Sequence, residues 1–267
     1  MTNAGASAAP FQPTAFLDTN VLVRLFQFWD ACQTAQIRLD AISDWENLKA
    51  ALAAASVATG ALNGIDADYV KLGMKAFQHL QTSAGDYRYV SSRVCRSEMH
   101  HVLLEGRGLE HLKLQGVPHS LRVKRPQVLY RVALNEQDYM HLDTQLETFR
   151  TALSLDYSLE VTDVEDSSVD FGVSPDGIWD DAQAIWSHIL MEVMDAYLCA
   201  AAIRIKADVF ITADTSLRDA LNRIRDPDSD WATLAASLKR ALSMKPTEEL
   251  PLPLRPGRAL PTSLSSP

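Results

Sequence analysis

Two short apolar segments that run into acidic residues most constrain the fold of this chain. The segment "AFLDTN" begins at Ala15, and the segment "DVFITAD" ends at Asp214. Short apolar runs bounded by polar residues are typical of strands that are buried on both faces of a parallel sheet. Segments of helical composition separate these runs, so the sequence predicts an α/β fold with a parallel central sheet flanked by helices.

Hydrophobic periodicity and helix-breaking residues predict the other elements. We expect a further strand over 87–94, followed at once by a helix that stops at Gly106. Apolar positions spaced by three and four predict an amphipathic helix from Asn135. The polar, acidic stretch 162–177 predicts a loop. The remaining helices are expected over 43–58, 66–81 and 178–207, in the last case as one long helix or two consecutive ones, and from Thr215.

Composition limits the cellular setting. The three cysteines, Cys32, Cys95 and Cys199, are widely spaced and form no CxxC pair, which argues against a disulfide framework or a zinc site. No apolar run reaches the roughly 18 residues that span a bilayer. The first residues lack the charged start and long apolar core of a secretion signal. We therefore expect a soluble cytoplasmic protein that does not bind membranes.

Charge is distributed unevenly along the chain. The net charge is −9, yet the segment 136–181 holds thirteen acids and one base, so the rest of the chain is slightly basic. A basic stretch, 113–131, lies just upstream and contains Arg122, Lys124 and Arg125. This stretch could bind a polyanion, and we expect these three residues to contact RNA. The alternative is an ordinary solvated surface with uneven charge.

Four acids fall at strand ends or in helices next to a strand: Asp18, Glu98, Asp195 and Asp214. In parallel α/β sheets, ligands bind beyond the carboxyl ends of the strands, so these acids could converge there. Two bare carboxylates about 4 Å apart repel by roughly 4 kcal/mol at an effective dielectric constant of 20. Such a cluster either retains protons or binds a hard cation, and Mg²⁺ and Mn²⁺ prefer carboxylate oxygens.

Each acid also has an alternative role without a metal. Asp18 and Asp214 could cap the helices that follow their strands. Glu98 could be a solvated acid in the first turns of a helix, whereas Asp195 lies among Ala and Leu and is harder to explain as a surface residue. Glu192, three residues before Asp195, is either a further ligand or a solvated helix acid.

Three segments that contain these acids resemble the PIN-domain nucleases, and in particular their toxin members. They are "FLDTNVLV", "VSSRVCRSEMHHVLL" and "MDAYLCAAAIRIKADVFITAD", within 15–26, 87–106 and 190–222. In that family an Asp-x-Asn strand end, a Glu in an early helix, an Asp before small residues and a Thr-x-Asp strand end build one metal site.

The resemblance implies a three-layer α/β/α fold and a metal-dependent endoribonuclease that cleaves single-stranded RNA. It assigns Asp18, Glu98, Asp195 and Asp214 as ligands of Mg²⁺ or Mn²⁺. It assigns Asn20 and Thr212 to orienting those carboxylates. It also leaves open a homodimer and an antitoxin or other protein partner.

The chain departs from small PIN-domain toxins in length, since these are about half as long. We therefore expect a discontinuous nuclease domain, 14–106 and 181–240, interrupted by a mainly helical insertion, 107–180, that is first basic and then acidic. A Pro- and Ser-rich tail, 246–267, is expected to be disordered or extended.

The same residues bear on two other functions. A non-catalytic PIN-like scaffold that acts as a binding or regulatory protein is the main alternative, and the net acidity and the long insertion favour it. Metal-dependent cleavage distinguishes the two functions, because a scaffold needs no divalent ion. A phosphatase of the Asp-x-Asp type is disfavoured, because Asn20 stands where its second acid would be.

Overall fold

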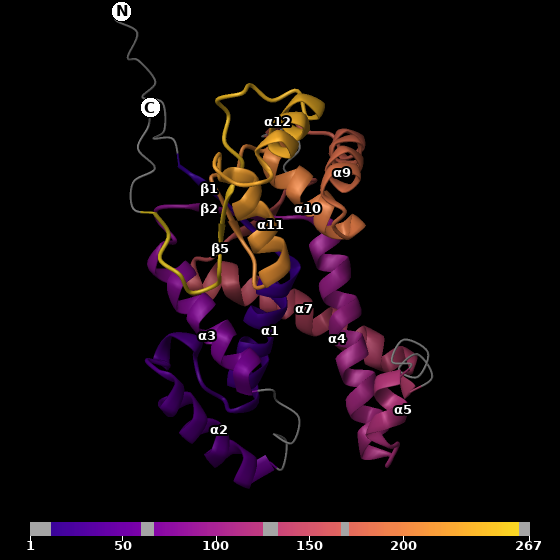
Figure 1. Ribbon diagram of the computed structural model, residues 1–267. Coiled ribbons are helices and arrows are strands. Elements are labelled where there is room, and N and C mark those ends of the chain that lie inside the picture. The colour runs from indigo at the N-terminus through magenta and orange to yellow at the C-terminus, as the bar shows by residue number, and fades with distance from the viewer. Residues whose placement is uncertain (1–11, 60–66, 125–132, 167–170, 262–267) are drawn as a thin grey trace, which may run out of the picture.

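The computed structural model describes residues 12–59, 67–124, 133–166 and 171–261 (Figure 1). In chain order the elements are β1 (Thr14–Leu17), α1 (Thr19–Thr34), the 3₁₀ helix η1 (Leu39–Ala41), α2 (Trp45–Thr59), α3 (Ala67–Thr82), β2 (Arg88–Ser91), α4 (Arg93–Leu114), α5 (His119–Lys124), α7 (Glu136–Tyr157), β3 (Val161–Asp163), α9 (Pro175–Ile189), α10 (Val193–Arg204), β4 (Val209–Ile211), α11 (Thr215–Arg225), α12 (Ala232–Ala241) and β5 (Leu252–Leu254).

The five strands form one parallel sheet in the order β3-β2-β1-β4-β5. At the centre, Phe16 of β1 is in register with Val90 of β2 and with Phe210 of β4. All four residues of β1 are buried, as are all three of β4. The expected α/β fold with a parallel sheet flanked by helices is confirmed.

The strand order places helices on both faces of the sheet. The chain moves outward from β1 to β2 and β3, then returns to β4 and β5 on the other side of β1. Because such crossovers are right-handed, the first set of helices and the second set cover opposite faces. Helix α1 contacts α2, α3, α4 and α7, whereas α9 contacts α10 and α12 (Figure 1). The direction of winding reverses between β1 and β4.

Aromatic side chains fill the core on the β1 strand and the α1 helix. Phe16 stacks on Phe210 across β1 and β4, with ring centroids 5.5 Å apart. On α1, Phe26 and Trp29 both pack against Phe149 of α7. This contact fixes α7 on the same face as α1.

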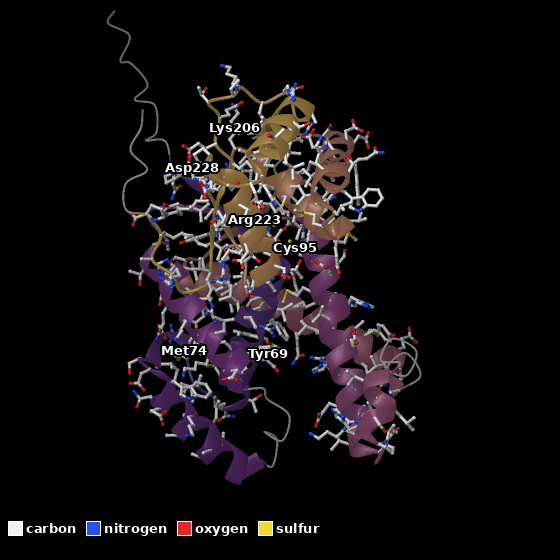
Figure 2. All side chains as sticks on the ribbon, viewed as in Figure 1. Tyr69, Met74, Cys95, Lys206, Arg223 and Asp228 are labelled. Carbon is white, nitrogen blue, oxygen red and sulfur yellow. The ribbon has the colours of Figure 1, made fainter. Side chains whose placement is uncertain are left out.

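The side chains divide clearly between inside and outside. In Figure 2 the buried Cys95 lies in the interior, whereas Lys206, Arg223 and Asp228 are exposed at the surface. All three cysteines are buried and free.

Three expectations about elements were wrong or incomplete. Helix α4 does not stop at Gly106 but continues to Leu114, because Gly108 and Leu112 are buried and keep one face of it packed beyond that glycine. The expected loop 162–177 includes residues of β3, which pairs with β2. Residues 252–254 of the tail are extended, which is one of the two expected alternatives, but they also form β5 of the sheet, which was not expected.

The sheet draws on more of the chain than the nuclease segments alone. β3 lies within 107–180 and α4 passes from residue 106 to 107 without a break. Pro253 of β5 is accommodated because β5 is an edge strand. The division into a nuclease domain and an insertion stays a prediction, as does the structure of 262–267, which lies outside the described residues. Within the described residues, none of the helices combines the length and apolar character that crossing a bilayer requires.

Candidate functional site

A hollow of about 660 Å³ lies at the carboxyl ends of β1 and β4, where the direction of winding reverses. This is the position at which open parallel sheets usually bind ligands. All four predicted metal-ligating acids line it, together with two further predicted residues: Asp18, Glu98, Asp195, Asp214, Asn20 and Glu192. Four different parts of the chain therefore bring their acids to one place.

Asp18 follows β1 directly and is the N-cap residue of α1. Its Oδ1 accepts a hydrogen bond from the Thr19 backbone N–H at 2.6 Å, and its Oδ2 accepts one from Asn20 and one from Thr212, each at 2.6 Å. Its side chain is 3% exposed. Burial raises the pKa of Asp18 to about 6, against the opposing effect of these hydrogen bonds, and the charge of Glu98 adds to the rise.

Asn20 and Thr212 tie the ends of the two central strands together. The Asn20 side chain accepts a hydrogen bond from the Ala213 backbone N–H at 2.7 Å, and Thr212 Oγ1 accepts one from the Asp214 N–H at 2.9 Å. Both side chains also donate to Asp18 Oδ2. The orientation of the Asp18 carboxylate is thus set from β1 and from β4.

Glu98 enters the hollow from the second turn of α4. Thr19 Oγ1 donates a 2.5 Å hydrogen bond to Glu98 Oε2, which links α4 to the start of α1. The N-terminus of α4 is held in turn by Glu165, which accepts hydrogen bonds from the Ser92 hydroxyl and the Arg93 N–H. Glu165 follows β3, so the position of Glu98 depends on that edge strand.

Asp195 lies in the first turn of α10, whose N-cap is Glu192. Burial, together with the negative charges of Asp18, Asp214 and Glu192, raises the pKa of Asp195 to about 7. Among the described residues no hydrogen-bond donor is directed at its carboxylate. Of the four acids, Asp195 is therefore the one whose negative charge is least stabilised by hydrogen bonds.

Asp214 is the N-cap of α11 and accepts a 2.9 Å hydrogen bond from the Leu217 backbone N–H. The structure therefore confirms that both acids cap helices, as the sequence suggested: Asp214 caps α11 and Asp18 caps α1. A carboxylate has two oxygens and about four acceptor positions, so capping leaves acceptor capacity for another ligand.

The donor chemistry of this hollow fits a hard divalent cation. The acids supply only oxygen ligands, and their mutual repulsion would be relieved by positive charge. Among the described residues, however, no three His, Cys, Asp or Glu side chains are arranged to hold a metal ion by themselves. Mg²⁺ commonly binds through one or two carboxylates, with water and substrate phosphate completing its coordination.

Two lining residues were missed in the sequence. Thr19 positions Glu98 through its hydrogen bond. Arg24 also lines the hollow, and it is basic, unlike the other lining residues in the described part of the chain. Arg24 stands four residues after Asn20, on the same face of α1, and this spacing could have identified it. Its guanidinium lies over the ring of Tyr69, 3.4 Å from the ring centroid.

Of the residues predicted to contact RNA, Arg122 does not line this hollow. Arg122 and Lys124 belong to α5, which packs against the far part of α4. Arg122 Nε donates a 3.0 Å hydrogen bond to the Val117 carbonyl. Arg125 lies outside the described residues.

Comparison with models of protein families, with curated proteins and with solved structures finds no match to this chain.

Proposed function

We propose that this protein is a metal-dependent endoribonuclease that cleaves single-stranded RNA at the four-acid hollow. The observation that carries the proposal is the convergence of Asp18, Glu98, Asp195 and Asp214 on the switch point of the sheet. A structural protein has no need to gather four like charges in one hollow, at a cost in electrostatic repulsion. The resemblance of the surrounding motifs to PIN-domain nucleases supports RNA as the substrate.

The four acids would hold Mg²⁺ or Mn²⁺, with Glu192 available as a further ligand. When bound, such an ion activates water and stabilises the charge that develops on a phosphodiester. Asn20 and Thr212 keep the Asp18 oxygens oriented through their hydrogen bonds. The pKa of Asp195 is raised to about 7 by burial and by the neighbouring acids, and a bound cation would relieve this repulsion and hold the carboxylate in its charged form.

A non-catalytic scaffold is the second candidate, and the helix caps favour it. Asp18 and Asp214 each cap a helix, so both acids would have a role without any metal. Capping does not account for Asp195 or Glu98, which accept no hydrogen bond from a helix N-terminus in the described structure. Asp195 therefore distinguishes the two functions best, because a metal-dependent nuclease needs its carboxylate and a scaffold does not.

The test is cleavage of a mixed single-stranded RNA pool in Mn²⁺, Mg²⁺ or EDTA, by the wild type and by Asp195→Asn. We expect cleavage that requires a divalent ion and falls at least about 100-fold in the variant, in line with loss of a group that acts in the transition state. Asp228→Asn, which changes an exposed acid far from the hollow, is the matched control and should retain full activity. Equal cleavage by wild type and Asp195→Asn, or none by either folded protein, would favour the scaffold.

A further inference from the structure

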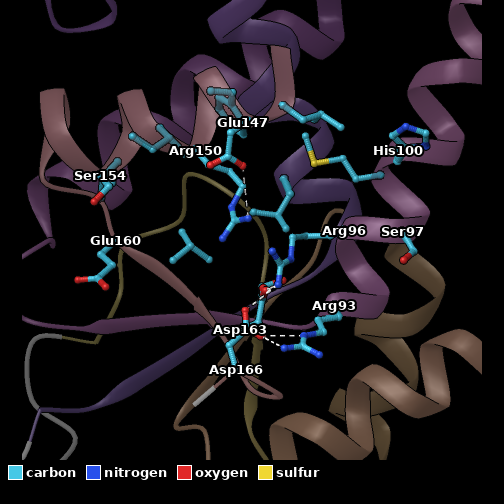
Figure 3. A pocket seen from close by; sticks show the side chains of 18 of the residues that line it. Arg93, Arg96, Ser97, His100, Glu147, Arg150, Ser154, Glu160, Asp163 and Asp166 are labelled. Atoms are coloured by element: carbon cyan, nitrogen blue, oxygen red, sulfur yellow. Dashed lines mark hydrogen bonds and ion pairs between the residues drawn. The ribbon is translucent and has the colours of Figure 1, made fainter. Parts of the chain in front are cut away.

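A second and larger hollow, of about 1010 Å³, lies on the other side of α4 (Figure 3). It is bounded by α4, α7 and the end of β3, and none of the four acids lines it. Glu98 and Val102 of α4 face the first hollow, whereas Arg96 and His100 face the second. The first turns of α4 thus form a wall shared by the two hollows.

Three guanidinium groups gather in this second hollow: those of Arg93, Arg96 and Arg150 (Figure 3). Arg93 and Arg96 are paired, because both contact Asp166 and Arg96 also contacts Asp163. Arg150 comes from α7 and has one ion pair among the described residues, with Glu147, at the long distance of 3.9 Å. Its hydrogen-bond donors are therefore available to a ligand.

The guanidiniums repel one another. The pKa of Arg96 is lowered from its usual value by burial and then by the positive charges of Arg150 and Arg93. An anion between Arg150 and Arg96 would relieve this repulsion and accept charge-assisted hydrogen bonds. Guanidinium groups suit phosphate in particular, because two of their N–H groups can bond to it at once.

The other residues that line the second hollow indicate what the rest of the ligand should be like. Partly exposed apolar side chains, such as Leu146 and Val161, offer a surface for an uncharged body. The hydroxyl of Ser154 and the carboxylates of Glu147 and Glu160 can accept hydrogen bonds from it. The ligand should therefore combine a phosphate, an uncharged body and hydrogen-bond donors.

We propose that the second hollow binds one nucleotide unit, with its phosphate at Arg150 and Arg96 and its base along the apolar wall. A nucleotide has the required phosphate, base and donor groups, and the volume suits a small-molecule site. The choice of a nucleotide rests on the proposed nuclease function, because an RNA strand bound at the four-acid hollow could continue past the first turns of α4 into the second hollow. The unit is either part of the RNA strand or a free nucleotide.

Affinity measured in EDTA tests this without any cleavage. The probes are AMP and a single-stranded RNA hexamer, titrated into wild type, Arg150→Ala, Arg150→Lys and Glu147→Gln. Arg150→Ala should weaken binding at least about tenfold, as expected when a charge-assisted contact is lost, and Arg150→Lys should restore part of it. Glu147→Gln removes a negative charge from the hollow and should bind as well as wild type or more tightly.

Two controls separate this site from others. Arg38→Ala removes an exposed arginine that pairs with Asp40 elsewhere on the surface, and it should bind like wild type. Asp228→Asn changes an exposed acid that does not line the second hollow, and it should also bind like wild type. Because binding is measured in EDTA, where no cleavage occurs, the affinity assay and the cleavage assay can fail independently.

The outcomes decide between the sources of the nucleotide. Weaker AMP binding by Arg150→Ala supports a site that also accepts free nucleotides. Weakening for the hexamer alone supports the site with the RNA strand as its source. The proposal is overturned if wild type binds neither probe, if Arg150→Ala binds both as wild type does, or if Arg38→Ala weakens binding as much as Arg150→Ala.

Discussion

At the residue scale, Asp18 and Asp195 differ in how the protein compensates the cost of burying a carboxylate. Asp18 is almost fully buried, but its carboxylate accepts three hydrogen bonds, from Thr19, Asn20 and Thr212, which stabilise its negative charge. Asp195 is less buried and has no such donors in the described structure, so its neighbours' charges act on it without compensation. Carboxylates whose mutual repulsion is not compensated are common at functional sites, where they lower the stability of the protein.

The stability of the metal-free protein should therefore depend on pH in a defined direction. The pKa values of Asp18 and Asp195 in the folded state, about 6 and about 7, lie above the ordinary 3.8. The folded state then holds protons that the unfolded state has released, so stability falls as pH rises from about 4 to about 7 and is constant above that.

Asp195→Asn removes one of these two groups and should make the metal-free protein more stable at pH 8. After allowance for solvent screening at this partly exposed site, we expect a gain of about 1–2 kcal/mol. The difference should shrink toward zero at pH 4.5, where the carboxyl is largely protonated in the folded state. Urea unfolding in EDTA at both pH values measures it, and a variant less stable than wild type at pH 8 would contradict the electrostatic account.

At the element scale, the close packing of α3 against α1 depends on one small residue. A Cβ atom on Gly73 would lie 2.0 Å from the Arg24 carbonyl oxygen of α1 and 2.9 Å from Phe28 Cβ. Arg24 lines the four-acid hollow, so this contact also supports one wall of the site. Helix backbones can approach this closely only where one of them carries no side chain.

Gly73→Ala should push the two helices apart and lower the free energy of unfolding by about 1–3 kcal/mol, the usual cost of overpacking. Gly106→Ala is the matched control, because a Cβ there meets nothing within 4 Å. Since alanine favours the interior of a helix, Gly106→Ala should instead stabilise the protein by up to about 1 kcal/mol. Urea unfolding of both variants distinguishes the two effects, and equal shifts would contradict the packing argument.

The sequence was most informative where an element is apolar along its whole length. β1 and β4 were predictable because their residues are buried on both faces and are followed by acids. In β3 only Asp163 is buried of the three residues, so the sequence carries no such signal there and predicts a loop over 162–177. Gly106 suggested a helix end, but packing of α4 beyond it outweighs the small cost of a glycine.

At the scale of the whole molecule, the strand order decides which residues meet. Asp18 and Asp214 are 196 positions apart, yet β1 and β4 are hydrogen-bonded neighbours. The four-acid hollow could be anticipated because acids at strand ends share one edge of a parallel sheet. The second hollow could not, because the convergence of Arg96, Arg150 and Asp163 depends on how α4, α7 and β3 pack.

The central claim is that the four acids form a site for a divalent cation, and a calorimetric titration with Mn²⁺ at pH 8 tests it most directly. The account predicts binding by wild type that weakens at least about tenfold in Asp195→Asn. Wild-type affinity should also fall at pH 5.5, where protons compete for carboxylates whose pKa values are about 6 and about 7. If folded wild type binds no Mn²⁺, or binds it as Asp195→Asn does, the acids are not a metal site and the nuclease proposal loses its basis.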